Sequence, residues 1–312
     1  MSEQTKVSPD DRAFFGHPRG LATLFFLEMW ERFSYYGMSA ILLYYLYDRT
    51  SDGGLGMDKP TSSALVSIYG ALVFMSGIFG GWLADRVLGM RRAVLVGGLL
   101  IMCGHLALTV PGGLPALLVS MLLIVVGTGL LKPNVSSLVG ELYSPADHRR
   151  DAGFSLFYMG INLGAFLAPY LVGTLGQQIG YHLGFGLAAV GMAVGLVVYA
   201  RGRARLGQAG DAPTNPLRAG ERRQVGRRAA VGVAVLVVAV AVLAVTGSLT
   251  VQALINAVSV LAVLLPAAYL VMMLRSPHTD AVERSRLIAY IPLFLGAVAV
   301  ALIVRTISGK CL

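Results

Sequence analysis

Two carboxylates and a guanidinium lie inside a long apolar run of the sequence, residues 21–47. A charged side chain in membrane hydrocarbon costs at least about 2.5–3.5 kcal/mol, so such groups must face a protein interior or a water-filled cavity and contact one another. At helical spacing they share one face, because side chains three and four residues apart line up. That face carries Glu28, Glu31, Arg32, Tyr35 and Ser39. The pattern favours an ion or substrate pathway; the alternative is a structural salt bridge that locks two helices together.

A lysine occupies a comparable position in a later apolar run. Lys132 precedes Pro133 and Asn134, and further apolar residues follow before the next charged loop. We therefore expect Lys132 to lie some turns deep in the membrane, where a neighbouring carboxylate would govern its charge. If Lys132 lies close to Glu28 or Glu31, these groups form a proton-sensitive cluster with the guanidinium. The alternative is a lysine whose side chain extends to the membrane surface.

Two polar side chains recur at helical spacing within residues 153–175. Tyr158 and Asn162 are four residues apart and therefore share a face of the expected helix. An Asn amide in a membrane span commonly bonds to another helix, and it could equally bind the backbone amide of a substrate. The spacing leaves both roles open.

A short charged connection follows the second apolar run. It begins Gly-Trp-Leu-Ala-Asp-Arg at residue 81 and continues through a glycine to an arginine pair; its charged members are Asp85, Arg86, Arg91 and Arg92. This pattern resembles the cytoplasmic loop signature of the major facilitator superfamily. The resemblance implies a gating role, in which Asp85 pairs with a neighbouring helix end or an arginine and holds the inward gate closed. The alternative is a charged loop that only follows the positive-inside rule.

The composition places these residues in a membrane protein. Of 312 residues, 56% are hydrophobic and 13% are charged, against about 25% charged residues in a typical soluble domain. The formal net charge of +9 does not indicate nucleic acid, because the basic residues lie in short connections between apolar runs. Residues 1–14 lack the basic-then-apolar pattern of a cleaved signal peptide. Cys103 and Cys311 do not indicate a disulfide framework.

Nine apolar runs approach the length of about 20 residues that a membrane-spanning helix needs. They cover residues 21–47, 61–84, 93–110, 114–131 (continuing as a helix to 142), 153–175, 183–200, 229–246, 251–274 and 287–304. Basic residues concentrate in alternate connections, which the positive-inside rule assigns to the cytoplasm together with the N-terminus. The prediction is an all-α membrane protein. Its parts are a cytoplasmic tail 1–19, a six-helix bundle 20–201, a cytoplasmic linker 202–228, an additional helix pair 229–275 and the first span of a second bundle, 286–312.

The charged stretch of the first run carries a specific resemblance. Residues 28–37 match the Glu-x-x-Glu-Arg-Phe-x-Tyr-Tyr-Gly motif of the proton-dependent oligopeptide transporter (POT) family, and residues 127–143 and 157–164 resemble its two further signatures. The similarity is close over residues 18–206 and looser beyond them. It implies the major facilitator fold and a proton-coupling cluster of Glu28, Glu31, Arg32 and Lys132. It also implies a peptide-binding pocket lined by Arg32, Tyr35, Tyr36, Lys132, Tyr158 and Asn162.

The chain departs from the family pattern at two positions and at its end. Ser39 stands where many members carry an Arg, Phe74 stands where a pocket Tyr is common, and either change would shift substrate choice. The family also needs a second six-helix bundle, whose first span usually bears a Trp and a Glu. Residues 298–312 contain neither. We therefore expect a C-terminally truncated chain that holds the carboxylate-binding half of a transporter.

The expected function is proton-coupled symport of di- and tripeptides across the cell membrane. Protons would be the coupling ion, with no other cofactor and no metal site. The expected partners are a small peptide, protons, the lipid bilayer and a separately supplied C-terminal bundle, but no nucleic acid. Three alternatives stay open: a related symporter of nitrate or drug-like molecules, a non-transporting remnant, and a membrane enzyme that uses Glu28 and Glu31 as acid and base. No Ser-His-Asp pattern or histidine cluster supports enzymatic activity, since the five histidines are scattered at positions 17, 105, 148, 182 and 278.

Overall fold

The computed structural model describes residues 11–308 except 145, 219, 228–229, 232–233, 235–241, 243–244, 246–250 and 277–278. Helices dominate the described part, and its only strand-like pairing is an isolated bridge between Phe14 and His17. The chain divides into two compact units, Met1–Ile255 and Asn256–Leu312. Each unit is described by itself.

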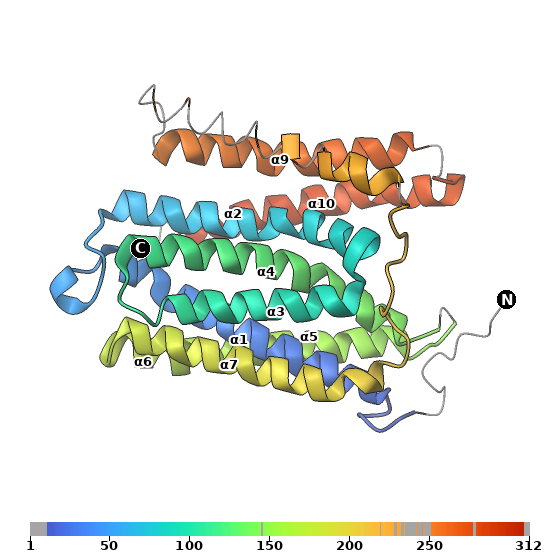
Figure 1. Ribbon diagram of the computed structural model, residues 1–312, viewed down its shortest axis with the longest axis horizontal. Coiled ribbons are helices and arrows are strands. Elements are labelled where there is room, and N and C mark those ends of the chain that lie inside the picture. Colours follow the sequence, from blue (N-terminus) through green and yellow to red (C-terminus); the bar gives the residue numbers. More distant parts are fainter. Residues whose placement is uncertain are drawn as a thin grey trace. The chain divides into compact units, whose positions relative to one another are not determined.

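The described residues 11–206 of the first unit form six long helical segments, some of which continue through short π- or 3-10-helical turns. Figure 1 shows these helices side by side. Their bounds are α1 Arg19–Tyr47; α2 Lys59–Leu83 with π-turn η2 Ala84–Leu88; α3 Met90–Ala107; α4 Gly113–Glu141; α5 Arg150–Ala168 with π-turn η3 Pro169–Gly173 and α6 Thr174–Gln178; and α7 Tyr181–Gly202 with 3-10 turn η4 Arg203–Leu206. A further 3-10 turn, η1 Thr50–Asp52, follows α1. Pro133 lies inside an uninterrupted α4, whereas Pro169 begins the π-turn after α5.

Six segments among the described residues are long and apolar enough to cross a membrane. They are Lys59–Leu88, Met90–Ala107, Gly113–Glu141, Arg150–Gln178, Tyr181–Leu206 and Ile255–Arg275. α1 is as long as α4, at 29 residues each, but the charged side chains in its interior, Glu28, Glu31 and Arg32, lower its hydropathy. The predicted all-α membrane class is confirmed.

The second unit holds most of α9 (Val251–Arg275) and α10 (Ala281–Ser308). Each helix contains a proline, Pro266 in α9 and Pro292 in α10. The predicted span 229–246 is described only at isolated positions. His278, Cys311 and the side chains of residues 298–312 lie outside the described part of the chain.

α1 is the central helix of the first unit. It packs against α5 and α7 along most of its length and also contacts α2 and α4. Its first turns, around Leu24 and Leu27, belong to one cluster of buried apolar side chains, and its later turns, around Ile41 and Leu42, belong to another. The turn that carries the charged residues lies between these two apolar cores.

Glycine permits backbone contact between helices on either side of the charged turn. A Cβ atom on Gly164 of α5 would lie 2.1 Å from the carbonyl oxygen of Met29 in α1, and one on Gly80 of α2 would lie 1.9 Å from the carbonyl oxygen of Gly129 in α4. Both distances are far below van der Waals contact, so only glycine fits. Small residues allow helices to approach in this way in lipid. By contrast, a Cβ atom on Gly77, in the same glycine-rich stretch, would meet no atom within 4 Å.

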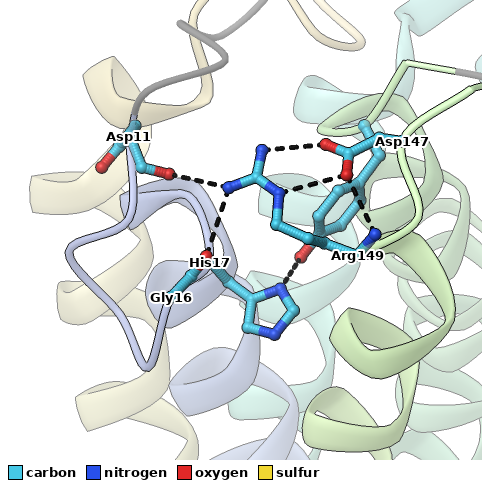
Figure 2. Close-up of polar contacts among 6 residues, drawn as sticks. Asp11, Gly16, His17, Asp147 and Arg149 are labelled. Atoms are coloured by element: carbon cyan, nitrogen blue, oxygen red, sulfur yellow. Dashed lines mark hydrogen bonds and ion pairs between the residues drawn. The ribbon is translucent and has the colours of Figure 1, made fainter.

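Arg149 fastens the segment that leads into α1 to the connection between α4 and α5 (Figure 2). Its Nη1 donates to the carbonyl oxygens of Gly16 and Asp11, at 3.2 and 3.5 Å. Its Nε and Nη2 donate to the carboxylate of Asp147, at 3.1 and 2.9 Å. The guanidinium of Arg149 therefore anchors residues 11–17 of the predicted tail to the bundle.

We expect His17 to make the anchored segment sensitive to pH. It is buried, and its Nδ1 lies 2.9 Å from the hydroxyl of Tyr143. Burial and the nearby Arg149 lower the pKa of His17 from its usual value of 6.5, while Asp147 opposes this change. Because the pKa is lower in the anchored segment than in a detached one, the stability that neutral His17 contributes is present above pH 6.5 and is lost as pH falls through the lowered value.

We therefore expect residues 11–17 to exchange amide hydrogens faster at about pH 5 than at about pH 7.5, after correction for intrinsic rates. The measurement is hydrogen exchange of the chain in lipid nanodiscs. His17→Gln should remove the pH dependence because no titrating group then remains at this position. Equal protection of the wild-type segment at both pH values would show that His17 does not control the anchor.

Candidate functional site

Glu28, Glu31 and Arg32 form an ionic cluster in the interior of the first unit. Their side chains are 2%, 0% and 5% exposed. Arg32 Nε lies 3.1 Å from Glu28 Oε1, one turn earlier in α1, and also contacts Glu31 Oε2. All three side chains are buried within the first unit, where α5 and α7 pack against α1.

Several buried polar atoms of Glu28, Glu31 and Arg32 have no hydrogen-bond partner among the described residues. Arg32 Nε is at ion-pair distance from both carboxylates, but its contacts lack the direction of hydrogen bonds. Arg32 Nη2, Glu28 Oε2 and Glu31 Oε1 are also buried without a hydrogen-bond partner among the described residues. An unsatisfied buried polar group costs about 1–3 kcal/mol, more when it is charged. Buried donors and acceptors without a hydrogen-bond partner suit a site that binds protons or an ionic ligand.

Tyr69 of α2 belongs to this site, and the sequence did not reveal it. Its side chain is 3% exposed, and its hydroxyl has no hydrogen-bond partner among the described residues. It lies within electrostatic range of Glu31, Arg32 and Tyr35. A lone tyrosine in an apolar run is also common in helix packing, so the run itself gave no reason to select it. The available signal was the hydroxyl, which usually needs a partner when it is buried.

Lys132 approaches the cluster from α4. Its side chain is half-buried and lies within electrostatic range of the three charged groups of α1. Its Nζ lies 4.4 Å from the ring centroid of Phe74 on α2, a distance typical of a cation–π contact. Phe74, one of the two departures from the family pattern, therefore places its ring against the lysine.

The aromatic pair after the cluster extends it along α1. The guanidinium carbon of Arg32 lies 5.4 Å from the ring centroid of Tyr35. The rings of Tyr35 and Tyr36 meet edge to face, with their centroids 5.3 Å apart, and Tyr36 is 39% exposed. Ser39 Oγ donates to the carbonyl oxygen of Tyr35 at 2.8 Å, within the same helix. Ser39 thus bonds to its own backbone, where an arginine would offer a ligand a positive charge.

Tyr158 and Asn162 occupy an exposed face of α5. Asn162 Nδ2 donates to the carbonyl oxygen of Tyr158 at 3.0 Å, within the helix, and the Tyr158 side chain is 57% exposed. In the described part of the chain, no hydrogen bond links either side chain to the ionic cluster. The side-chain oxygen of Asn162 (Oδ1) and the hydroxyl of Tyr158 could therefore bind a ligand on this face.

The predicted gate residues divide into two sets. Asp85, Arg86 and Arg91 all contact the segment that follows α7. Arg92 is exposed, and within the described residues it has no hydrogen bond or ion pair from its side chain. The gating role of these four residues stays a prediction.

Membrane-crossing helices that enclose charged side chains, with a lysine within electrostatic range, define a multi-pass membrane protein with a buried ionic site. The model of the POT family matches residues 91–307, more than half of the chain. The chain belongs to the POT family, a family of transporters, as the motif at residues 28–37 predicted.

Known relatives and solved structures agree with this assignment. The chain is 58% identical over 298 residues to "Uncharacterized transporter YclF" of Bacillus subtilis (strain 168), covering 95% of this chain. It is 49% identical over 296 residues to "Di-/tripeptide transporter" of Lactococcus lactis subsp. lactis (strain IL1403), covering 94%. A crystal structure of peptide transporter POT in complex with sulfate is 62% identical with a TM-score of 0.82, over 91% of this chain and 58% of that chain. The chain spans 60% of the length of both curated relatives.

Proposed function

We propose that this chain contributes the proton-binding and carboxylate-binding part of a proton-coupled symporter of di- and tripeptides. The observation that carries the proposal is the buried cluster of Glu28, Glu31 and Arg32 with Lys132 within electrostatic range. A relative named as a di-/tripeptide transporter and a POT family structure in complex with a thioalcohol-conjugated peptide support the substrate class. The N-terminus would be cytoplasmic, following the positive-inside rule. Protons would be the coupling ion, without a further cofactor.

In this proposal, Glu28 and Glu31 compete with the terminal carboxylate of the peptide for the guanidinium of Arg32. When both carboxylates are ionised, they hold Arg32 through two ion pairs. A proton on Glu31 or Glu28 removes one of these pairs, so Arg32 and Lys132 can bind the terminal carboxylate of a peptide. Loss of the proton restores the ion pair and weakens the hold on the peptide. Side chains that would line the pocket around this carboxylate site are Tyr35, Tyr36, Tyr158 and Asn162.

The test is calorimetry of the 312-residue chain in lipid nanodiscs, titrated with dialanine at neutral pH. Titrations in two buffers of different ionisation enthalpy measure the protons taken up on binding. We expect binding with net proton uptake, because the peptide carboxylate displaces a glutamate that then protonates. Glu31→Gln should bind dialanine with much less proton uptake. No binding above that of empty nanodiscs, or the same proton uptake in Glu31→Gln, would contradict the proposal.

Lys132 gives a second prediction for the same assay. Lys132→Met should weaken dialanine binding about 10- to 100-fold, since a hydrogen bond to a charged group contributes about 1.5–3 kcal/mol. Lys132→Arg keeps the charge and should lose less affinity. The matched control is dialanine amide, which lacks the carboxylate and should bind wild type and Lys132→Met alike. An equal loss for both ligands would mean that Lys132 does not contact the carboxylate.

A further inference from the structure

The chain after α7 does not leave the bundle directly. Residues 207–218 and 220–221 pass across the adjoining ends of α2, α3 and α4 (Figure 1), and hydrogen bonds join them to each of these ends. We call this segment the strap. Its composition, rich in Arg, Gly and Pro, indicated only a linker. Its contacts fall into two parts that differ in burial.

The inner part of the strap, residues 207–211, is fastened by a buried arginine. Arg91 of α3 is 6% exposed, and its Nε donates to the carbonyl oxygen of Ala209 at 2.6 Å. Its Nη2 donates to the carbonyl oxygen of Gly207, and its backbone N–H donates to that of Gly210 at 3.0 Å. At α4, Glu141 Oε2 accepts the backbone N–H of Gly210 at 2.7 Å. The inner part is therefore held at both neighbouring helix ends.

The inner part also fits tightly against those helices. Gly210 has a φ angle of +64°, and a Cβ atom there would lie 2.4 Å from a side-chain carbon of Leu138. Gly89, with a φ angle of +76°, would place a Cβ atom 3.0 Å from the carbonyl oxygen of Asp211. Glycine is the residue that adopts such backbone angles without a steric penalty. The two glycines thus fix one path for the chain at this point.

The outer part, residues 214–218 with 220–221, lies along the π-turn after α2 and is more exposed. The backbone N–H groups of Asn215 and Leu217 donate to the carbonyl oxygens of Asp85 and Arg86, at 2.9 and 3.1 Å. Thr214 Oγ1 donates to Asp85 Oδ1 at 3.0 Å. Arg86 Nη2 lies 2.9 Å from a carboxylate oxygen of Glu221, whose side chain is 44% exposed. Exposed ion pairs of this kind contribute little, about 0–1 kcal/mol.

We propose that the turn formed by Asp85 and Arg86 is an interaction surface for the outer strap of the same chain, and that Arg91 is the positioning residue that delivers the strap to it. The surface fits a segment that pairs through the backbone of Asn215 and Leu217, with the hydroxyl of Thr214 before them and the carboxylate of Glu221 after them. The inner part stays attached to α3 and α4, and the outer part can detach from the turn after α2. Any other partner of Asp85 or Arg86, including the gate contact predicted from the sequence, must first displace the outer part of the strap. The competition with a gate contact rests on the proposed transport function, whereas the contacts of the strap are independent of it.

Amide hydrogen exchange of the 312-residue chain in nanodiscs tests the two parts separately. Arg91→Gln should speed exchange in residues 207–211 by more than about tenfold and also in residues 215–217, because it removes buried charged hydrogen bonds. Arg86→Glu should speed exchange two- to fivefold in residues 215–217 alone. The double variant Arg86→Glu with Glu221→Arg should restore protection there, which a nonspecific disturbance of the loop would not do. Arg92→Gln, next to Arg91 but exposed, is the matched control and should change neither part.

Two results would overturn the proposal. One is unchanged exchange of residues 207–211 in Arg91→Gln. The other is an equal effect of Arg86→Glu on both parts. If Arg91→Gln does not fold, Glu141→Ala tests the inner attachment from an exposed position of α4, and unchanged protection of Gly210 in that variant would likewise overturn it. The experiment needs no peptide, so it can fail while dialanine still binds, and it can succeed while dialanine does not.

Discussion

Replacing Arg32 by methionine should destabilise the first unit by about 3–5 kcal/mol. The substitution leaves two buried carboxylates without their cation, and breaking a buried ion pair from one side typically costs that much. Glu28 and Glu31 are at most 2% exposed, so water cannot substitute for the guanidinium. The measurement is the free energy of unfolding in mixed micelles, followed by circular dichroism as denaturing detergent is added.

A triple variant separates the ionic contribution to the free energy of unfolding from the contribution of side-chain packing. Adding Glu28→Gln and Glu31→Gln to Arg32→Met removes the charges that the single variant strands, so most of the lost stability should return. Dialanine binding should nevertheless remain lost in the triple variant, because the carboxylate-binding cation is still missing. If Arg32→Met is as stable as wild type, or if the triple variant is no more stable than the single one, the cluster is not the coupled ionic group that its distances indicate.

Gly80→Ala should cost at least about 1–3 kcal/mol, the usual range for overpacking a tight contact. The added methyl would fall 1.9 Å from the carbonyl oxygen of Gly129, so α2 and α4 must separate. This contact adjoins the Lys132 turn, since Asn134 Nδ2 also reaches the carbonyl oxygen of Gly80, at 3.4 Å. The same unfolding assay applies, and weaker dialanine binding should accompany the lost stability.

Gly77→Ala is the control for this prediction. It lies one turn earlier in α2 and has open space at the Cβ position. Because alanine is about 1 kcal/mol better than glycine in a helix interior, this variant should be neutral or slightly stabilising. Equal losses for Gly77→Ala and Gly80→Ala would mean that helix propensity, and not backbone contact, governs both positions.

The ionic cluster could be predicted from the sequence because charge in an apolar run is costly wherever the helix lies. That cost limited Glu28, Glu31 and Arg32 to the protein interior before any neighbouring helix was known. The family motif added Lys132 as the partner. Similar reasoning gave the fold class, since the apolar runs and alternating basic connections follow from the membrane itself.

The strap could not be predicted in the same way. Asp85, Arg86 and Arg91 fall in a stretch that the sequence predicts to be a connection between two spans, where charged residues cost little. The residue types therefore do not indicate which partners these side chains contact. Their contacts depend on the path taken by residues far along the chain, at 207–221. Tyr69 was missed for a related reason: its burial next to the cluster depends on how α2 packs. The glycines likewise look equivalent in sequence, although Gly80 contacts backbone and Gly77 has open space around it.

The enclosure of α1 by later helices also bears on how the chain enters the bilayer. α1 leaves the ribosome before α5 and α7, yet its charged turn makes it a poor candidate for lateral release into lipid by itself. The helices that cover it, α5 and α7, are synthesised only afterwards. Nascent α1 should therefore stay beside the insertion machinery until α5 and α7 arrive, and these helices should enter the bilayer together.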